Sequence, residues 1–154
     1  MTPAINAAKK AKIKYTVHEY EHDPAAPSFG VEAAEKLNVP PERVFKTLVV
    51  DAGGTLAVAV VPVMLMLDLK AMAKACGAKK AAMAEVRLVE RTTGYVVGGV
   101  SPLGQKKRLP TVIDESARDC GTVFVSGGRR GLDIELAPAD LAALTKGTFA
   151  PIAR

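Results

Sequence analysis

Hydrophobic and polar positions follow two periods along the chain, one typical of helices and the other of strands. Apolar Ile13, Tyr15 and Val17 alternate with polar residues, and such alternation predicts a half-buried strand. Thr2-Pro3 has the residue types that begin a helix. The pattern predicts helices over residues 4–12, 31–37, 69–75, 83–91 and 139–145, and short strands over residues 13–20, 44–50, 55–61, 79–81, 95–100, 111–113, 122–126 and 132–136.

Turn residues organise these elements into a sheet. Gly53-Gly54 and Gly127-Gly128 each separate two apolar runs, so both pairs predict hairpins. No regular alternation of strands and helices is present, which favours α+β with a mixed, mostly antiparallel, barrel-like sheet surrounded by helices. The 154 residues, taken as 1–154, are expected to form one domain with a single core.

Composition and charge narrow the classes of partner. Aromatic residues are only 5% and tryptophan is absent, so the core must consist mainly of Val, Leu, Ala and Ile. The net charge of +5 fits a polyanion such as RNA, although many basic proteins bind no nucleic acid. The longest apolar run, residues 56–67, is too short to cross a bilayer and contains Pro62, and the N-terminus lacks a signal-peptide pattern. We therefore expect no membrane association.

Cysteine and histidine give no metal-binding pattern. Cys76 and Cys120 are far apart and form no C-x-x-C motif, which favours two reduced thiols in a cytoplasmic protein. His18 and His22 are four residues apart, but we place the first on a strand and the second in a loop. The sequence predicts neither a metal site nor a cofactor.

Residues 94–110 combine glycines with consecutive cations. Gly98-Gly99 and Ser101 precede Lys106, Lys107 and Arg108, so bare backbone and positive charge occur in one stretch. This combination suits an anionic ligand or a developing oxyanion. A strand that ends in a tight turn with a solvated basic tip explains the same residues, and the stretch alone does not separate the two interpretations.

A second stretch repeats this chemistry. In residues 126–131, Ser126 and two glycines precede two arginines, and Asp133 follows on a predicted strand. A glycine hairpin with a basic tip is the alternative interpretation.

Lys46 is the most prominent candidate for chemistry. Alternation along residues 44–50 places Lys46 on the same face as Val44 and Leu48, so one apolar strand face carries a cation. Such a lysine either protects a sheet edge from aggregation or lines a pocket. No serine or cysteine occurs in a nucleophile motif, and this absence favours an activated substrate such as an aminoacyl ester.

The ordered set of motifs resembles the YbaK family of Cys-tRNA(Pro) deacylases, relatives of the editing domain of bacterial prolyl-tRNA synthetases. The resemblance depends on Asp23-Pro24, on Val44-Phe45-Lys46-Thr47-Leu48 and on Gly98-Gly99-Val100-Ser101-Pro102. It extends over residues 1–4, 20–30, 44–48, 67–70, 77–80, 93–107, 125–128 and 131–136. Residues 63–66 are more hydrophobic than the family pattern.

The resemblance implies roles for individual residues. Lys46 would hold the 3′ end of the tRNA or the ester, Gly98 would contact the aminoacyl group through its backbone, and Ser126 and Asp133 would be polar groups beside the substrate. The substrate-binding residues implied are Tyr20, Phe29, Thr47, Gly99 and Ser101.

It also implies a reaction and partners. The function would be trans-editing of Cys-tRNA(Pro), and of Cys-tRNA(Cys) as a further substrate, either by hydrolysis or by attack of the substrate thiol to release a thiolactone. Prolyl-tRNA synthetase would join a transient ternary complex and supply the tRNA specificity.

Two alternatives stay open from the sequence. One is deacylation of another mischarged tRNA such as Ala-tRNA(Pro), since related editing domains share a scaffold and differ in pocket lining. The other is a non-catalytic module that binds RNA or a nucleotide, which the scarcity of aromatic residues disfavours.

Overall fold

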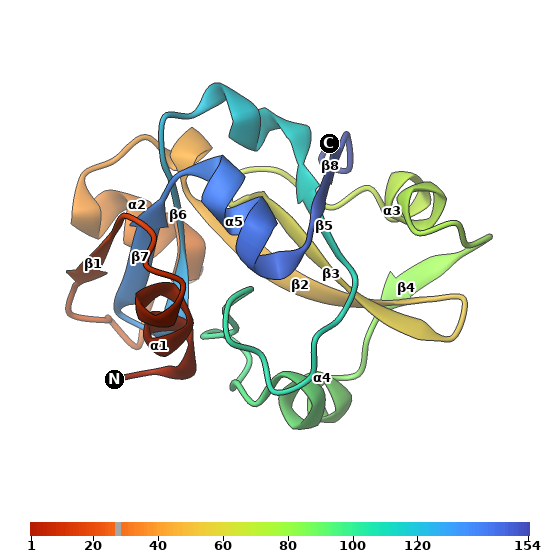
Figure 1. The fold of residues 1–154 in the computed structure, drawn as a ribbon, viewed down its shortest axis with the longest axis horizontal. Helices are drawn as coiled ribbons and strands as arrows, with labels where there is room; N and C mark the ends of the chain where they lie inside the picture. The colour runs from red at the N-terminus through yellow and green to blue at the C-terminus, as the bar shows by residue number, and fades with distance from the viewer. Residues whose placement is uncertain (27–28) are drawn as a thin grey trace.

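Two β-sheets that meet along one strand form the centre of the molecule (Figure 1). The structure, a computed structural model, describes residues 1–26 and 29–154. One sheet has three strands in the order β1-β7-β6, and the other has five in the order β4-β2-β3-β5-β8. A parallel bridge between Val44 and Phe124 joins them where β2 begins. The sheets do not close, so the barrel-like sheet expected from the sequence is only an approximation, whereas the α+β class is confirmed.

The strands are β1 (Tyr15–Glu19), β2 (Phe45–Ala52), β3 (Thr55–Pro62), β4 (Ala81–Met83), β5 (Thr111–Asp114), β6 (Val123–Arg129), β7 (Leu132–Leu136) and β8 (Thr148–Ala150). The helices are α1 (Pro3–Lys10), α2 (Phe29–Leu37), α3 (Leu69–Ala75), α4 (Val86–Thr93) and α5 (Pro138–Thr145), with short 3-10 turns η1 (Pro41–Arg43) and η2 (Glu115–Asp119). Most strand pairs are antiparallel, and β5 pairs in parallel with β3 and β8.

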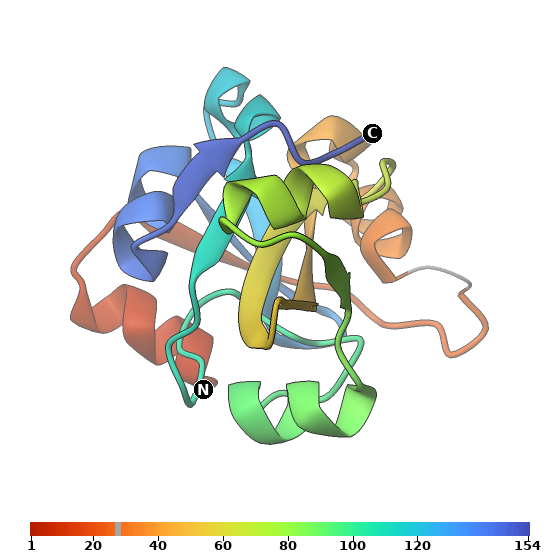
Figure 2. The same ribbon diagram turned by 90° about the vertical axis from the view of Figure 1, so that its right-hand side faces the viewer.

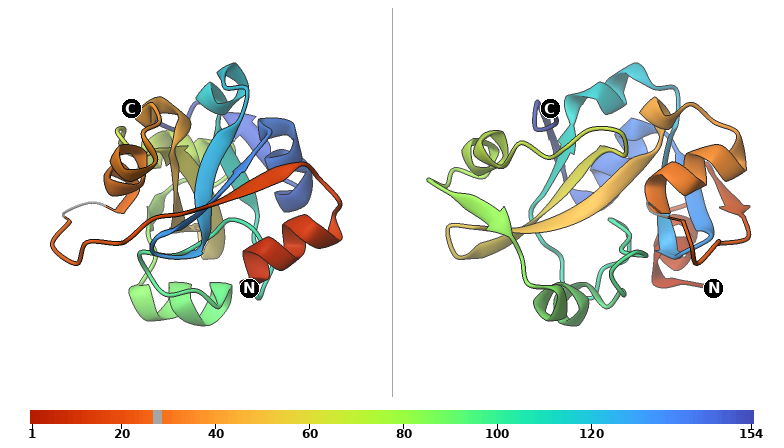
Figure 3. Two further views of the ribbon diagram at one scale, coloured as in Figure 1. Left: turned by 90° about the vertical axis from the view of Figure 1, so that its left-hand side faces the viewer. Right: turned by 180° about the vertical axis from the view of Figure 1, so that it is seen from behind.

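Alternation along β2 and β3 gives the five-stranded sheet apolar side chains on both faces. Phe45 and Val49 pack into the main core with the β6–β7 hairpin, α4 and α5. Val50 and Val61 point to the other face and pack against Met72 of α3, which lies across that face (Figure 2). Figure 3 shows the three-stranded sheet from its own side, flanked by α1 and α2. Strand β2 is therefore covered on both faces along most of its length.

Local signals explain where several elements begin and end. The Thr2 hydroxyl accepts a hydrogen bond from Ile5 N at the start of α1, and Asp68 accepts one from Ala71 N at the start of α3. Gly53 and Gly54 have φ of +65° and +93°, which the two-residue turn between β2 and β3 requires. The hairpin predicted at this glycine pair is confirmed.

The prediction of a strand over residues 95–100 is wrong. Gly94 ends α4 with φ of +82°, and the chain then turns so that Gly99 N donates to Val96 O at 2.9 Å. Tyr95 is buried and its hydroxyl donates to Leu103 O at 2.6 Å, which folds residues 94–103 onto themselves. Tyr95 and Val100 are buried within this loop, whereas Val96 and Val97 are exposed, and none of residues 95–100 pairs with a strand.

The second predicted glycine hairpin is also wrong in position. Gly127 and Gly128 lie within β6, and the turn is made by Arg130 and Gly131, the two residues that follow the end of β6. The register shifts between the pairs Ser126–Asp133 and Arg129–Leu132, so the glycines form an irregularity in the strand. Smaller differences are that β4 and α4 begin two and three residues later than predicted, and that β8 was not predicted.

Asp114 ties the C-terminal segment to β5, and its loss is expected to destabilise the fold. Its buried carboxylate accepts hydrogen bonds from Ile152 N and Ala153 N, both at 3.0 Å, and from the Ser116 hydroxyl at 2.6 Å. We expect Asp114→Ala to lower the free energy of unfolding by about 2–4 kcal/mol, because it leaves buried N–H groups unpaired. Urea denaturation measures the change, with the exposed Asp119→Ala as control. Equal stability of the two variants would contradict this account.

Candidate functional site

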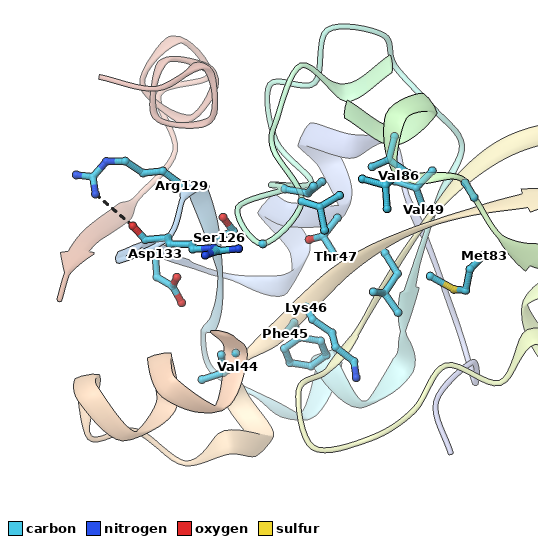
Figure 4. A pocket seen from close by; sticks show the side chains of 18 of the residues that line it. Val44, Phe45, Lys46, Thr47, Val49, Met83, Val86, Ser126, Arg129 and Asp133 are labelled. Atoms are coloured by element: carbon cyan, nitrogen blue, oxygen red, sulfur yellow. Dashed lines mark hydrogen bonds between the residues drawn. The ribbon is translucent and has the colours of Figure 1, made fainter. Parts of the chain in front are cut away.

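A cavity of about 340 Å³ lies between β2, the β6–β7 hairpin, and α4 with the loop that follows it. Its lining residues are Tyr20, Gly30, Val44, Phe45, Lys46, Thr47, Leu48, Val49, Met83, Ala84, Val86, Val89, Val97, Gly98, Val100, Ser126, Arg129, Arg130 and Asp133. Figure 4 shows the polar side chains of the hairpin on one side and apolar side chains of β2, β4 and α4 on the other. Lys46 and Thr47 lie between the two groups.

Lys46 of β2 is among the residues that line this cavity. It makes no ion pair with any of the residues that the structure describes, and partial burial lowers the pKa of its ammonium group. The neighbouring Thr47 hydroxyl is buried and has no hydrogen-bond partner within residues 1–26 and 29–154. A cation and a hydroxyl are thus available to a bound molecule.

Asp133 is the buried acid of the site. It lies on β7 opposite Ser126 of β6 and His18 of β1, and only 6% of its surface is exposed. Burial raises the pKa of Asp133 to about 7, because the charged carboxylate loses its solvation. At neutral pH this group is near the midpoint of its titration, so it can both accept and donate a proton.

Tyr20 and Ser126 add hydroxyl groups at the same end of the cavity. Burial, followed by the nearby charge of Asp133, raises the pKa of Tyr20 to about 12. The Ser126 Oγ accepts a hydrogen bond from Gly128 N at 3.1 Å, which orients the serine at the irregularity in β6. Both hydroxyls are neutral at physiological pH and act as hydrogen-bonding groups.

Gly98 brings backbone to the cavity. Its φ of +99°, together with the hydrogen bond from Gly99 N to Val96 O, fits a type II turn, which favours glycine at this position. Glu90 of α4 fixes the turn by accepting a hydrogen bond from Val97 N at 2.8 Å. The backbone of Gly98 is therefore held by α4 at the cavity wall.

Two of the predicted site residues, Gly99 and Ser101, are not among those that line the cavity. Gly99 packs on the backbone of Arg129, where an added Cβ would lie 2.8 Å from the Arg129 Cα. Ser101 is fully buried and its Oγ accepts a hydrogen bond from Leu103 N at 3.2 Å. Phe29 is the first residue of α2, and its side chain lies outside what the structure describes. Gly99 and Ser101 thus support the loop that carries Gly98.

The cations of residues 106–108 are separate from the cavity. Lys106 N and Lys107 N donate to the carbonyls of Thr93 and Thr92 at the end of α4. Arg108 lines a different hollow, which it shares with Lys10 of α1. Gly98 therefore lines the cavity, whereas the cations that follow it in the sequence do not. The cations at the cavity are instead Lys46, Arg129 and Arg130.

Sequence reasoning did not find the apolar wall of the cavity. Met83, Val86 and Val97 line it although they are 52%, 54% and 40% exposed. Residues 83–91 were predicted as one helix, and helical spacing by itself does not distinguish a cavity wall from core. None of the hydrophobic residues 63–66 lines the cavity. Val63 is buried next to Gly30, and Met64, Leu65 and Met66 are exposed in the segment after β3.

The arrangement favours binding and polarisation of an ester over attack by a protein nucleophile. The lining contains no cysteine and no histidine among the described residues. Within the same residues, no group of three His, Cys, Asp or Glu side chains could hold a metal ion, and no helix is both long and apolar enough to cross a bilayer. The cavity can hold a carbonyl oxygen near Lys46, with backbone and hydroxyl donors around it.

Comparison with known proteins gives matches along nearly the whole chain. A sequence profile described as "Aminoacyl-tRNA editing domain" matches residues 23–144. A protein of Enterococcus faecalis named "Putative Cys-tRNA(Pro)/Cys-tRNA(Cys) deacylase EbsC" is 42% identical over 153 residues, which are 98% of this chain and 92% of that protein.

Solved structures share the fold. One described as a "putative trans-editing enzyme for prolyl tRNA synthetase" has a TM-score of 0.87 and 25% identity, covering 99% of this chain and 95% of that chain. A hypothetical protein has a TM-score of 0.88 at 25% identity, with coverage of 99% and 100%. Sequence and fold therefore point to the same group of proteins.

The raised pKa of Asp133 predicts a pH-dependent cost of burial. Between the ordinary pKa of 3.8 and the folded value of about 7, the folded protein keeps a proton that the unfolded chain has lost, so this group lowers stability as pH rises. Asp133→Asn should have a higher free energy of unfolding than the wild type. We expect this difference to grow by about 2 kcal/mol from pH 5 to pH 8. Urea denaturation at both pH values tests this, with the exposed Asp119→Asn as control. A gain that is the same at both pH values would contradict it.

Proposed function

Because this chain belongs to the aminoacyl-tRNA editing domain family, we propose that it removes cysteine from mischarged Cys-tRNA(Pro) in trans, and that it also accepts Cys-tRNA(Cys). The relative with 42% identity supports the substrate, since its name carries both tRNAs. The observation that carries the proposal is Lys46, a cation without an ion-pair partner among the described residues, in a cavity whose described lining lacks cysteine and histidine.

The chemistry of such a site depends on the substrate. In the proposed reaction the substrate thiol attacks its own ester carbonyl, a C–S bond forms, and the C–O bond to the ribose breaks. The thiol proton passes to the ribose oxygen, and a cyclic thiolactone leaves. Hydrolysis, in which water attacks the same carbonyl and the cysteine leaves as a free acid, is the alternative for the same bond.

The cavity residues would lower the barrier by positioning and by charge. Lys46 would stabilise the negative charge that develops on the carbonyl oxygen or hold the adjoining 3′ end, and the Gly98 backbone would orient the aminoacyl group. Asp133, with its pKa raised to about 7, would exchange a proton near the substrate, and Ser126, Tyr20 and Thr47 would offer hydroxyls. Gly99 and Ser101 would support the Gly98 turn from behind instead of contacting the substrate, and a substrate-binding role for Phe29 stays a prediction.

The tRNA specificity would come from a partner. The cavity is large enough for the aminoacyl end alone, so little of the tRNA body is read there. Prolyl-tRNA synthetase confuses cysteine with proline because the two amino acids are similar in size. We propose that the synthetase hands over the mischarged tRNA in a transient ternary complex, in the cytoplasm where the tRNA is charged.

The test compares release of amino acid from Cys-tRNA(Pro), Ser-tRNA(Pro) and Ala-tRNA(Pro) by the wild type and two lysine variants. We expect cysteine to be released at least about 100-fold faster than serine or alanine, because only the thiol can close the ring. Lys46→Ala is expected to lose about 100-fold or more in kcat/KM, whereas the exposed Lys70→Ala keeps wild-type activity.

Each other outcome has a distinct meaning. Equal rates on cysteine and alanine esters would exclude thiolactone formation and favour attack by water. Preference for alanine would reassign the protein to Ala-tRNA(Pro). Absence of release from every ester, with RNA still bound, would leave a non-catalytic binding module.

A further inference from the structure

The β6–β7 hairpin places two consecutive arginines at the rim of the cavity. Arg129 and Arg130 both line the cavity and both are exposed. The Arg129 guanidinium donates to Arg130 O at 3.4 Å, drawn as the dashed line in Figure 4, and lies 3.6 Å from the Glu19 carboxylate. The side chains of this ion pair are 56% and 71% exposed, so the pair contributes little free energy and is easily exchanged for another anion.

Glycines fix the backbone that carries Arg129. Gly128 has φ of +113°, and a Cβ there would lie 2.9 Å from the Tyr95 ring. A Cβ at Gly99 would lie 2.8 Å from the Arg129 Cα, and one at Gly131 would lie 2.6 Å from Tyr20 O. Side chains at Gly99 or Gly128 would push the hairpin away from the loop that carries Gly98, and a side chain at Gly131 would push it away from Tyr20. The close backbone packing therefore sets the position of Arg129 relative to the cavity.

We propose that the Arg129–Arg130 turn binds the phosphodiester groups of the last nucleotides of the aminoacylated RNA strand. The proposal rests on the proposed function, because an ester held near Lys46 places the neighbouring phosphate about one ribose away, at the rim. A guanidinium group binds a phosphate through two parallel N–H···O hydrogen bonds, which a solvated lysine does not reproduce. The phosphate would displace Glu19 from Arg129.

The other cationic stretch does not compete for this role. Lys106 and Lys107 are held at the end of α4, and Arg108 lines the hollow beside α1. None of the three lines the cavity. The arginines of the hairpin are thus the exposed cations placed to meet the strand where it enters the site.

The first measurement is binding of a fluorescent, non-acylated oligoribonucleotide ending in CCA, at several salt concentrations. We expect Arg129→Gln to weaken binding about tenfold. It should also reduce the slope of log Kd against log salt by about 0.7, the change for one lost contact with a single-strand phosphate. Arg118→Gln is the matched control. The Arg118 guanidinium carbon lies 4.6 Å from the centre of the Phe149 ring, and Arg118 does not line the cavity.

The second measurement separates phosphate binding from a structural role. On Cys-tRNA(Pro), Arg129→Gln should raise KM with kcat kept, whereas on cysteinyl-adenosine, which has no phosphate, its kcat/KM should stay within about twofold of the wild type. Equal losses on the two esters, or an unchanged affinity and salt slope for the oligoribonucleotide, would overturn the proposal. A wild type that binds the oligoribonucleotide through Arg129 but releases no amino acid would contradict the proposed function and leave phosphate binding supported.

Discussion

Apolar packing on both faces of β2 is the constraint on which the site depends. Phe45 and Val49 are fixed in the main core, and Val50 is fixed against α3 on the other face, so the strand cannot slip or rotate. Lys46 and Thr47 are carried by this rigid strand where it borders the cavity of the candidate site. A cation on a rigid strand is positioned without help from an ion-pair partner, and it keeps its charge for a bound anion or a polarised carbonyl.

The second constraint is the contact between two irregular segments. The loop that carries Gly98 and the irregular part of β6 approach so closely that backbone lies on backbone at Gly99 and Arg129. The Thr2 hydroxyl donates to Gly127 O at 2.5 Å, so α1 holds the same part of β6 from outside. The polar end of the cavity is thereby assembled from α1, β6 and the loop after α4, which are far apart in sequence.

The sequence predicted the fold correctly where an alternation of apolar and polar residues was enough to determine a strand. Alternation alone identified β2 and β3, because both strands are long and their turn needs two glycines with positive φ, but it left open whether Lys46 lines a pocket or protects a sheet edge. Sequence reasoning failed over residues 95–100, where a run of β-branched residues predicted a strand but the hydrogen bond from the Tyr95 hydroxyl to Leu103 O holds a loop. It placed the turn of the second hairpin three residues early, since an irregularity in a strand and a turn both use glycine. The apolar wall of Met83 and Val86 was not predictable, because it exists only once α4 lies beside β2.

A site with this composition has to discriminate by reaction and not by size alone. A hydrophobic wall distinguishes amino acids that differ by one methylene only weakly, so a pocket that accepts cysteine also admits similar small side chains. When the attacking group belongs to the substrate, an admitted amino acid without a thiol stays attached, because the described lining supplies neither cysteine nor histidine to replace it. The protein then needs only a fixed cation, a turn of backbone and a proton-exchanging acid, and these are the groups that β2, the Gly98 turn and β7 bring together.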